Sequence, residues 1–137
     1  MPQIIVKAML IVRNKDKLLF SRGYDSVKKR AFLRPLGGHV EFGERGAETI
    51  RREIKEELGC EARDVKFLSV IEHLFTYNGE RKHEIILMYA GNLSDESLYR
   101  KGKFTFMEGE RKTEAGWFSE EDVKREKLPI YPPFTYF

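Results

Sequence analysis

The segment from Ala47 to Leu58 constrains the fold of this chain most strongly, because its pattern predicts an amphipathic helix with one buried face. The apolar residues of that face follow one another at spacings of three, four and four positions: Ala47, Ile50, Ile54 and Leu58. Gly59 comes directly afterwards and is typical of the residue that ends a helix. The rest of the chain must therefore supply a layer against which this stripe packs.

Apolar runs on either side of the helix predict β-strands. Residues 4–12, IIVKAMLIV, are apolar on both faces and rich in β-branched side chains, which indicates a buried strand. The other expected strands cover residues 17–21, 40–42, 65–77, 83–90, 104–107 and 115–118. A hairpin turn is expected at Asn78-Gly79, and a short helix capped by Ser119 is expected to reach Lys127. This alternation predicts a mixed α/β fold in a single domain, residues 1–137.

The composition describes a soluble globular protein. Hydrophobic residues make up 41% and charged residues 34% of the 137 positions, which suits one packed domain. No apolar run is long enough to span a bilayer, and the N-terminus lacks the features of a signal peptide. The single cysteine, Cys60, excludes an internal disulfide framework, so we expect a reducing, cytoplasmic setting. The net charge of +3 is too small to predict nucleic-acid binding and suits a small anionic ligand.

Three glutamates crowd into the last two turns of the expected helix: Glu53, Glu56 and Glu57. On a helical projection Glu53 and Glu57 fall beside the edge of the apolar stripe, and Glu56 lies one step further round. Carboxylates at such a boundary need a partner, and Arg52 can offset only one of them. A hard divalent cation can offset the rest, because Mg²⁺ prefers oxygen ligands and is commonly held by carboxylates together with phosphate oxygens. The alternative interpretation is a charged helix face exposed to solvent.

The spacing around the helix favours the metal-binding interpretation. It follows the pattern G-x5-E-x7-R-E-U-x-E-E-x-G, where U is aliphatic, at Gly38, Glu44, Arg52, Glu53, Ile54, Glu56, Glu57 and Gly59. The stretch from Gly38 to Gly59 resembles the signature box of the Nudix hydrolases, enzymes that cleave a diphosphate linked to another moiety. The chain is similar to MutT-like and ADP-ribose pyrophosphatase-like members of that family. The resemblance implies an α/β/α sandwich with a mixed β-sheet across most of the chain.

The resemblance also implies roles for the box residues. Glu53, Glu56 and Glu57 are expected to hold one or more Mg²⁺ ions, for which Mn²⁺ is an expected substitute, with a backbone carbonyl from the Gly38 region. Arg52 is expected to orient a carboxylate, and Glu44 to act through metal-bound water or as an acceptor at the helix start. The base for the attacking water is either Glu53 or an acid outside the box: Glu84, Glu108, Glu110 or Glu114. The last three belong to a polar stretch, 108–114, which is expected to be a loop in which a base could move in on binding.

Substrate contacts are expected from basic and aromatic residues. Arg30, Arg34 and His39 lie close to the glycines and are candidates for phosphate contacts, although a solvated basic face is equally compatible with Arg30 and Arg34, and a solvated loop position with His39. Four aromatic residues, expected in or near loops, are candidates for stacking a nucleobase: Phe32, Tyr77, Phe106 and Tyr131. The aromatic tail, residues 131–137, is expected to dock on the domain or on a partner subunit, which leaves a homodimer open.

The expected activity is Mg²⁺-dependent cleavage of a nucleoside diphosphate derivative, such as a nucleotide sugar, ADP-ribose or a nucleoside triphosphate. The expected partner is this small diphosphate compound, with no membrane and no strong sign of nucleic acid. The alternative is a binding module that kept the fold and senses a nucleotide without cutting it, although the intact box argues against it. A member acting on capped RNA would need a basic stripe or an extra domain, and the sequence shows neither.

Overall fold

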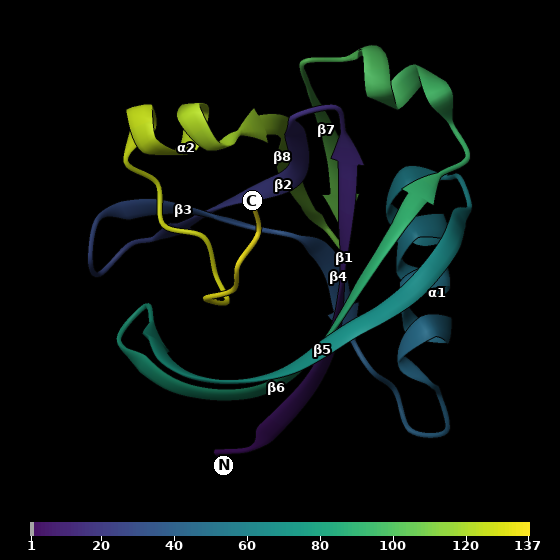
Figure 1. The fold of residues 1–137 in the computed structure, drawn as a ribbon. Coiled ribbons are helices and arrows are strands. Elements are labelled where there is room, and N and C mark those ends of the chain that lie inside the picture. Colours follow the sequence, from purple (N-terminus) through teal and green to yellow (C-terminus); the bar gives the residue numbers. More distant parts are fainter. Residues whose placement is uncertain (1) are drawn as a thin grey trace.

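The computed structural model describes residues 2–137 and contains a mixed β-sheet with two α-helices (Figure 1). Its elements are, in chain order, β1 (Ile4–Asn14), β2 (Lys17–Asp25), β3 (Arg30–Arg34), β4 (Leu36–His39), α1 (Gly46–Leu58), β5 (Ala62–Tyr77), β6 (Glu80–Leu93), the 3-10 helix η1 (Glu96–Arg100), β7 (Lys103–Glu108), β8 (Arg111–Ser119) and α2 (Glu120–Glu126). The strand order is β5-β6-β1-β2-β8-β7, with β3 paired to β2 and β4 paired to β1. Strands β1 and β6 run parallel, and the other pairs are antiparallel. The predicted mixed sheet is therefore confirmed.

The sheet opens between β1 and β2. These two strands are paired only beside their hairpin, where Arg13 lies opposite Leu18 and Asn14 opposite Lys17. Further from the hairpin, β1 pairs with β4 and β2 pairs with β3. The short strand β4 is thereby held against the middle of β1, at the place where the two halves of the sheet diverge.

Alternating side chains of β1 build two hydrophobic cores. Ala8 and Leu10 pack with Ile54 of α1, and none of the three is more than 1% exposed. Met9 and Ile11 point the other way, into a core shared with α2 and the C-terminal tail. Figure 1 shows α1 on one side of β1, and α2 with the tail on the other. Each fully buried Leu or Ile side chain contributes roughly 1.5–3 kcal/mol, so both layers stabilise the fold. With helices on both sides of the mixed sheet, the predicted α/β/α sandwich is confirmed.

Helix α1 begins and ends almost where the sequence predicts. At its start the backbone N–H of Arg45 donates to Oε1 of Glu48 at 2.9 Å. At its end Gly59 has φ of 69°, and its N–H donates to the carbonyl oxygen of Lys55 at 3.0 Å. A residue with a Cβ is strained at that φ, so the glycine is required for this helix end. Neither α-helix of residues 2–137 combines the length and hydrophobicity that a membrane crossing requires.

The strand expected at residues 40–42 is wrong, because the strand lies just before it. β4 comprises Leu36–His39, and Phe42 is fully exposed in the turn that precedes α1. The physical reason is the close approach of β4 to β1. A Cβ on Gly37 would overlap the backbone of Ala8, so only a glycine allows this pairing.

The polar stretch 108–114 is not the loop expected from the sequence. β7 runs as far as Glu108 and β8 begins at Arg111, so only Gly109 and Glu110 form the turn. Antiparallel pairing places Glu108 opposite Arg111. A hairpin whose tip faces water carries polar residues much as a loop does, which is why the pattern misled the prediction. The 3-10 helix η1 is a further element that the sequence pattern does not predict.

The C-terminal tail docks on the domain, which confirms one of the two expectations for it. Tyr136 is 7% exposed, and its ring lies 5.5 Å from that of Phe20. The backbone N–H of Leu33 in β3 donates to the carbonyl oxygen of Pro129 at 2.9 Å, and the N–H of Tyr131 donates to the carbonyl oxygen of Leu33 at 2.8 Å. Residues 129–131 therefore run beside β3, hydrogen-bonded to it, before the tail reaches the core.

Candidate functional site

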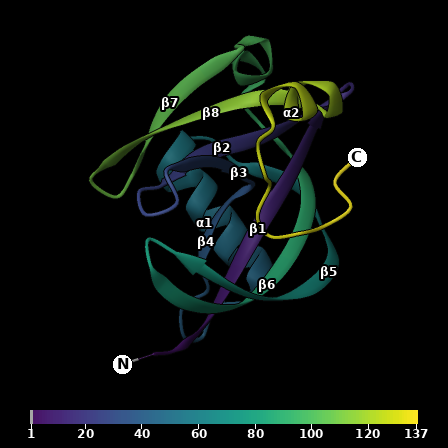
Figure 2. The ribbon, with the colours of Figure 1, turned by 90° about the vertical axis from the view of Figure 1, so that its left-hand side faces the viewer.

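The box residues meet where α1 packs beside β4. In Figure 2 this helix lies behind the sheet, on the side opposite the tail. Gly38 of β4 faces Glu53 of α1, and a Cβ on Gly38 would lie 2.5 Å from Oε1 and 2.8 Å from Oε2 of that glutamate. Only a glycine leaves room for the carboxylate at this position. The carbonyl oxygen of His39 accepts a hydrogen bond from Arg52 at 3.1 Å, which ties the glycine strand to the helix.

Arg52 joins the carboxylates of the box. Its Nε donates to Oε2 of Glu44 at 2.8 Å, and its Nη1 donates to Oε1 of Glu53 at 2.8 Å. Its distance to Glu56 is longer, 3.5 Å. The hydrogen bonds from Arg52 and from the Thr49 hydroxyl lower the pKa of Glu44 to about 2. Glu44 therefore stays ionised and anchors Arg52, and Arg52 in turn fixes the orientation of Glu53.

Glu57 carries a polar atom that the protein does not satisfy. Its Oε1 is buried and has no hydrogen-bond partner within residues 2–137. Burial, together with the neighbouring carboxylates of Glu53 and Glu108, raises the pKa of Glu57 to about 9. A buried carboxylate is stable in its ionised form only when a cation or hydrogen-bond donors lie beside it. This environment fits a bound cation.

Glu108 lines the same cavity as the box, which has a volume of about 460 Å³. Its carboxylate lies 3.0 Å from the guanidinium of Arg34 and 2.9 Å from that of Arg111. Burial works to raise the pKa of Glu108, but the two guanidinium groups outweigh it and lower that pKa below its ordinary value. Glu108 is therefore an ionised residue that holds Arg34 at the cavity.

The cavity brings together most of the site residues predicted from the sequence. Those that line it are Arg34, Gly38, His39, Arg52, Glu53, Glu56, Glu57 and Glu108. Glu44 is bonded to Arg52 but is not part of the lining. Glu110 is exposed in its turn, and exposed Glu114 lies 3.7 Å from Arg22, so neither of these acids lines the cavity. Arg30 and Glu84 line a neighbouring cavity instead.

The set of metal ligands stays a prediction. No group of three or more His, Cys, Asp or Glu side chains surrounds a common point in the part of the chain that the structure describes. Arg52 holds one oxygen of Glu53 and approaches Glu56, so these carboxylates are directed toward the guanidinium. The unpartnered oxygen of Glu57 and the space above Gly38 nevertheless suit a hard cation, which binds carboxylate and backbone oxygens.

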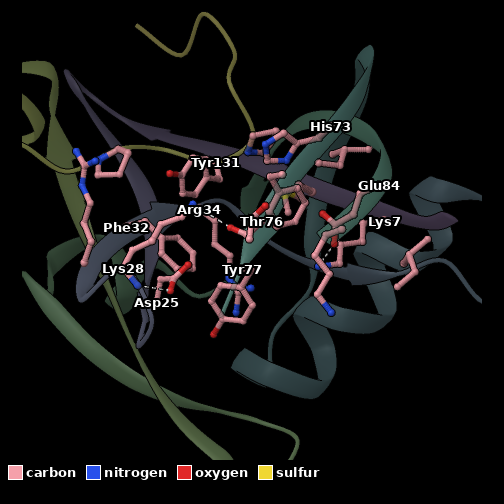
Figure 3. A pocket seen from close by; sticks show the side chains of 18 of the residues that line it. Lys7, Asp25, Lys28, Phe32, Arg34, His73, Thr76, Tyr77, Glu84 and Tyr131 are labelled. Carbon is pink, nitrogen blue, oxygen red and sulfur yellow. Dashed lines mark hydrogen bonds and ion pairs between the residues drawn. The ribbon is translucent and has the colours of Figure 1, made fainter. Parts of the chain in front are cut away.

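A second cavity, with a volume of about 260 Å³, adjoins the first (Figure 3). Four residues line both cavities: Lys7, Met9, Arg34 and His39. Figure 3 shows Phe32, Tyr77 and Tyr131 on one side of the second cavity, and Lys7 with Glu84 on the other. A compound that reaches from the box into this second cavity would pass Arg34 and Lys7.

Two aromatic candidates lie in strands, and each is 7% exposed. Phe106 is inside β7, in agreement with the strand expected at 104–107, whereas Phe32 is inside β3, where the sequence pattern predicts no strand. Phe32 lines the second cavity, whereas Phe106 lines the first. The sequence analysis missed Lys7, although one signal could have found it. Lys7 is the single charged residue in the apolar run 4–12, and a charge in a buried strand needs a partner.

Comparison with protein families gives one match over nearly the whole chain. The model described as the NUDIX domain matches residues 2–135. Among curated sequences, the protein named "Putative mutator protein MutT4" of Mycobacterium tuberculosis (strain CDC 1551 / Oshkosh) is 36% identical over 66 residues. That match covers 44% of this chain and 27% of the relative, so the chain spans a minor part of that longer protein.

Solved structures resemble this fold over almost its full length. A MutT NUDIX hydrolase from Burkholderia pseudomallei is 26% identical, with a TM-score of 0.63, and the match covers 97% of this chain and 91% of the other. A NUDIX hydrolase from Nitrosomonas europaea is 17% identical, with a TM-score of 0.67, covering 96% of this chain and 82% of the other. An ADP compounds hydrolase is 20% identical, with a TM-score of 0.62, covering 92% and 63% respectively. The last two similarities concern the fold alone.

Proposed function

The chain belongs to the Nudix family of hydrolases, which act on pyrophosphate bonds, and we propose that it cleaves the diphosphate linkage of a nucleoside diphosphate derivative with the help of Mg²⁺. Mn²⁺ is the expected substitute for Mg²⁺, because both are hard cations that prefer oxygen ligands. A nucleotide sugar, ADP-ribose and a nucleoside triphosphate are the candidate substrates. Each carries the polyanionic linkage that a site with acidic metal ligands and nearby arginines suits.

Three carboxylates are proposed to hold the cation: Glu53, Glu56 and Glu57. Arg52 positions Glu53 through the hydrogen bond at 2.8 Å, and Glu44 positions Arg52. The missing Cβ at Gly38 leaves room for the Glu53 carboxylate and for a backbone carbonyl to approach the cation. When bound, a divalent cation neutralises the diphosphate charge and lowers the pKa of the attacking water.

We assign the proton-accepting role to Glu53. Among the acids of residues 2–137 that lie outside the box, only Glu108 lines the catalytic cavity, and its pairing with Arg34 and Arg111 lowers its pKa. A carboxylate held by two guanidinium groups is a poor proton acceptor, because protonation would break both ion pairs. Glu108 is better suited to orienting Arg34 toward a substrate phosphate, with His39 as a second phosphate contact.

The observation that carries this proposal is the buried, unpartnered Oε1 of Glu57. An unsatisfied polar atom of this kind is costly, and a protein retains it where a ligand completes its environment. Glu57 lines a cavity that Glu53, Arg34 and Gly38 also line. An anionic substrate and a cation would together satisfy these groups.

The test is an activity panel with a matched pair of variants. The protein is incubated with ADP-ribose, nucleotide sugars and nucleoside triphosphates, with Mg²⁺, with Mn²⁺ or with EDTA, and phosphate-containing products are quantified. Glu57→Gln should lower kcat by about 10²-fold or more, because the amide keeps the shape of the side chain but cannot bind a cation as a carboxylate does. Glu61→Gln, four residues further on and outside the cavity, should leave kcat unchanged.

Three outcomes would contradict the proposed function. Turnover that persists in EDTA would exclude the metal, and full activity of Glu57→Gln would exclude the assigned ligand. If nucleotides bind but none is cleaved, the sensing module becomes the better description.

We further propose that residues 1–137 act as one domain on a small molecule in the cytoplasm. Cys60 is a free, buried thiol, which suits a reducing compartment. Val70 and Leu74 on β5 are 54% and 60% exposed, and apolar exposure of this kind supports a homodimer. Light scattering at several protein concentrations would test that assembly.

A further inference from the structure

The second cavity is walled by a continuous chain of aromatic rings, here called the aromatic belt: Tyr77, Phe32, Tyr131, His73 and Phe75. Neighbouring rings lie close together, with centroid distances of 5.8, 5.3, 5.8 and 4.2 Å in that order. The belt draws on three separate segments, namely β3, β5 and the C-terminal tail. Burial lowers the pKa of His73, so its ring is a neutral member of the belt. Such a wall suits a flat ring system, because one aromatic face stacks on another whatever atoms make up the two rings.

The same cavity contains a buried ion pair. Nζ of Lys7 on β1 lies 2.7 Å from Oε2 of Glu84 on β6, with side-chain exposures of 18% and 7%. Neither side chain makes another ion pair or side-chain hydrogen bond within residues 2–137. Lys7 therefore retains N–H donors, and Glu84 retains acceptor capacity, on the surface of an otherwise largely apolar cavity.

A buried pair with unused hydrogen-bonding capacity discriminates between ligands. A ligand that offers an N–H donor beside an acceptor would satisfy both side chains at once. A ligand with an apolar or purely accepting edge would displace water from the Glu84 carboxylate without replacing its hydrogen bonds, which costs affinity. Nitrogen heterocycles combine a stackable face with such an edge, whereas sugars and alkyl chains lack the flat face.

We propose that Glu84, held in place by Lys7, is a specificity-determining residue that accepts an N–H hydrogen bond from a nitrogen heterocycle stacked against the aromatic belt. This inference rests on the proposed function. In that function the diphosphate of the substrate extends from the second cavity, past Arg34 and Lys7, to the box. It replaces the role that the sequence suggested for Glu84. The carboxylate lines the aromatic cavity and is absent from the lining of the cavity that contains Glu53 and Glu57, so it recognises the substrate and does not accept the proton of the attacking water.

The test measures binding separately from cleavage. Isothermal calorimetry in EDTA compares AMP, GMP, CMP and UMP with ribose 5-phosphate, which carries the same phosphorylated sugar without a base. The native protein should bind at least one of the four nucleotides about 10-fold more tightly than ribose 5-phosphate. Glu84→Gln should weaken that nucleotide by about 10-fold or more, the effect of losing a hydrogen bond to a charged group, and should leave ribose 5-phosphate unchanged.

Two further variants sharpen the test. Glu80→Gln changes an exposed acid on the same strand, outside the second cavity, and should bind every ligand as the native protein does. Tyr131→Leu removes one ring of the belt from a partly exposed position and should weaken the nucleotide by about 10-fold, again without affecting ribose 5-phosphate. Because ribose 5-phosphate binding persists in these variants, it also reports that they are folded.

The inference is overturned if the native protein binds no nucleotide more tightly than ribose 5-phosphate, or if Glu84→Gln weakens both ligands equally or neither. These results differ from a failure of the proposed function. A protein that cleaves diphosphates without base preference would refute only the role of Glu84. A protein that shows the expected binding differences but cleaves nothing would refute only the catalytic proposal.

Discussion

Replacing Gly38 by alanine tests the closest contact in the candidate site. The backbone of Gly38 does not adopt a positive φ, so alanine fits its conformation. The new Cβ would nevertheless lie 2.5 Å from Oε1 of Glu53, whereas ordinary contacts begin at 3.4 Å. The carboxylate must therefore move by about 1 Å, and the hydrogen bond of 2.8 Å from Arg52 to that oxygen would be lost or rebuilt.

The expected result is a large loss of activity with a small loss of stability. A displacement of about 1 Å at a catalytic group costs on the order of 10²-fold in rate. The colliding atoms form the end of a flexible side chain, so the free energy of unfolding should fall by less than about 1.5 kcal/mol. Initial rates of diphosphate cleavage and urea denaturation of the same preparation measure the two quantities.

Gly102→Ala is the matched control. A Cβ on Gly102 meets no atom within 4 Å, so this variant should keep both native activity and native stability. If Gly38→Ala retains activity within a factor of about two, the Glu53 carboxylate does not need the position observed here. If the free energy of unfolding of Gly38→Ala falls by several kcal/mol, Gly38 is required for packing, and the argument from the Glu53 carboxylate is refuted.

Other substitutions test the surrounding structure. Arg52→Ala should lower kcat by about 10²-fold, and Arg52→Lys should not restore it, because an ammonium cannot reproduce the forked contacts to Glu44; steady-state kinetics decides this. Ile54→Ala removes a side chain that is 0% exposed and should cost about 2–5 kcal/mol in urea denaturation, whereas a cost below about 1 kcal/mol would contradict its place in the core. Ser119→Ala deletes the acceptor for the N–H of Asp122 at 3.1 Å and should destabilise the protein by about 1 kcal/mol, seen as a lower Tm. The backbone N–H of Ser119 holds the pKa of Asp122 at about 2, below its ordinary 3.8, so the stabilisation from Asp122 is complete above pH 4 and fades as the pH falls toward 2. Asp122→Asn should flatten the stability profile in that range when acid unfolding is followed by circular dichroism, and an unchanged profile would refute the linkage.

Much of the local structure could be predicted because it depends on residues close together in the chain. The spacing from Ala47 to Leu58 predicts α1, and Gly59 ends it, because helix periodicity and capping act within a few residues. The hairpin at Asn78-Gly79 follows for the same reason. The run 4–12 is a strand as predicted, and the alternate residues of 8–12 face two cores. Its first part is not buried, because Ile4 and Val6 are 61% and 38% exposed.

The failed predictions concern segments whose structure depends on partners far away in the chain. Residues 40–42 have an alternating pattern, yet β4 lies before them because Gly37 can approach Ala8. Glu108 is strand and not loop because β8 pairs with it. No local pattern contains either interaction.

The sequence by itself determined the box, its helix and the clustering of Glu53, Glu56 and Glu57, because the positions of these residues follow from helix geometry alone. Tertiary structure decided which further side chains share a cavity with them. It brought Glu108 and Arg34 to the box, removed Glu110 and Glu114 from it, and placed Glu84 beside Lys7 in a separate aromatic cavity. The physical reason is that strand pairing joins residues that are many positions apart, and the burial and ion pairing that define a carboxylate's chemistry exist only after that pairing.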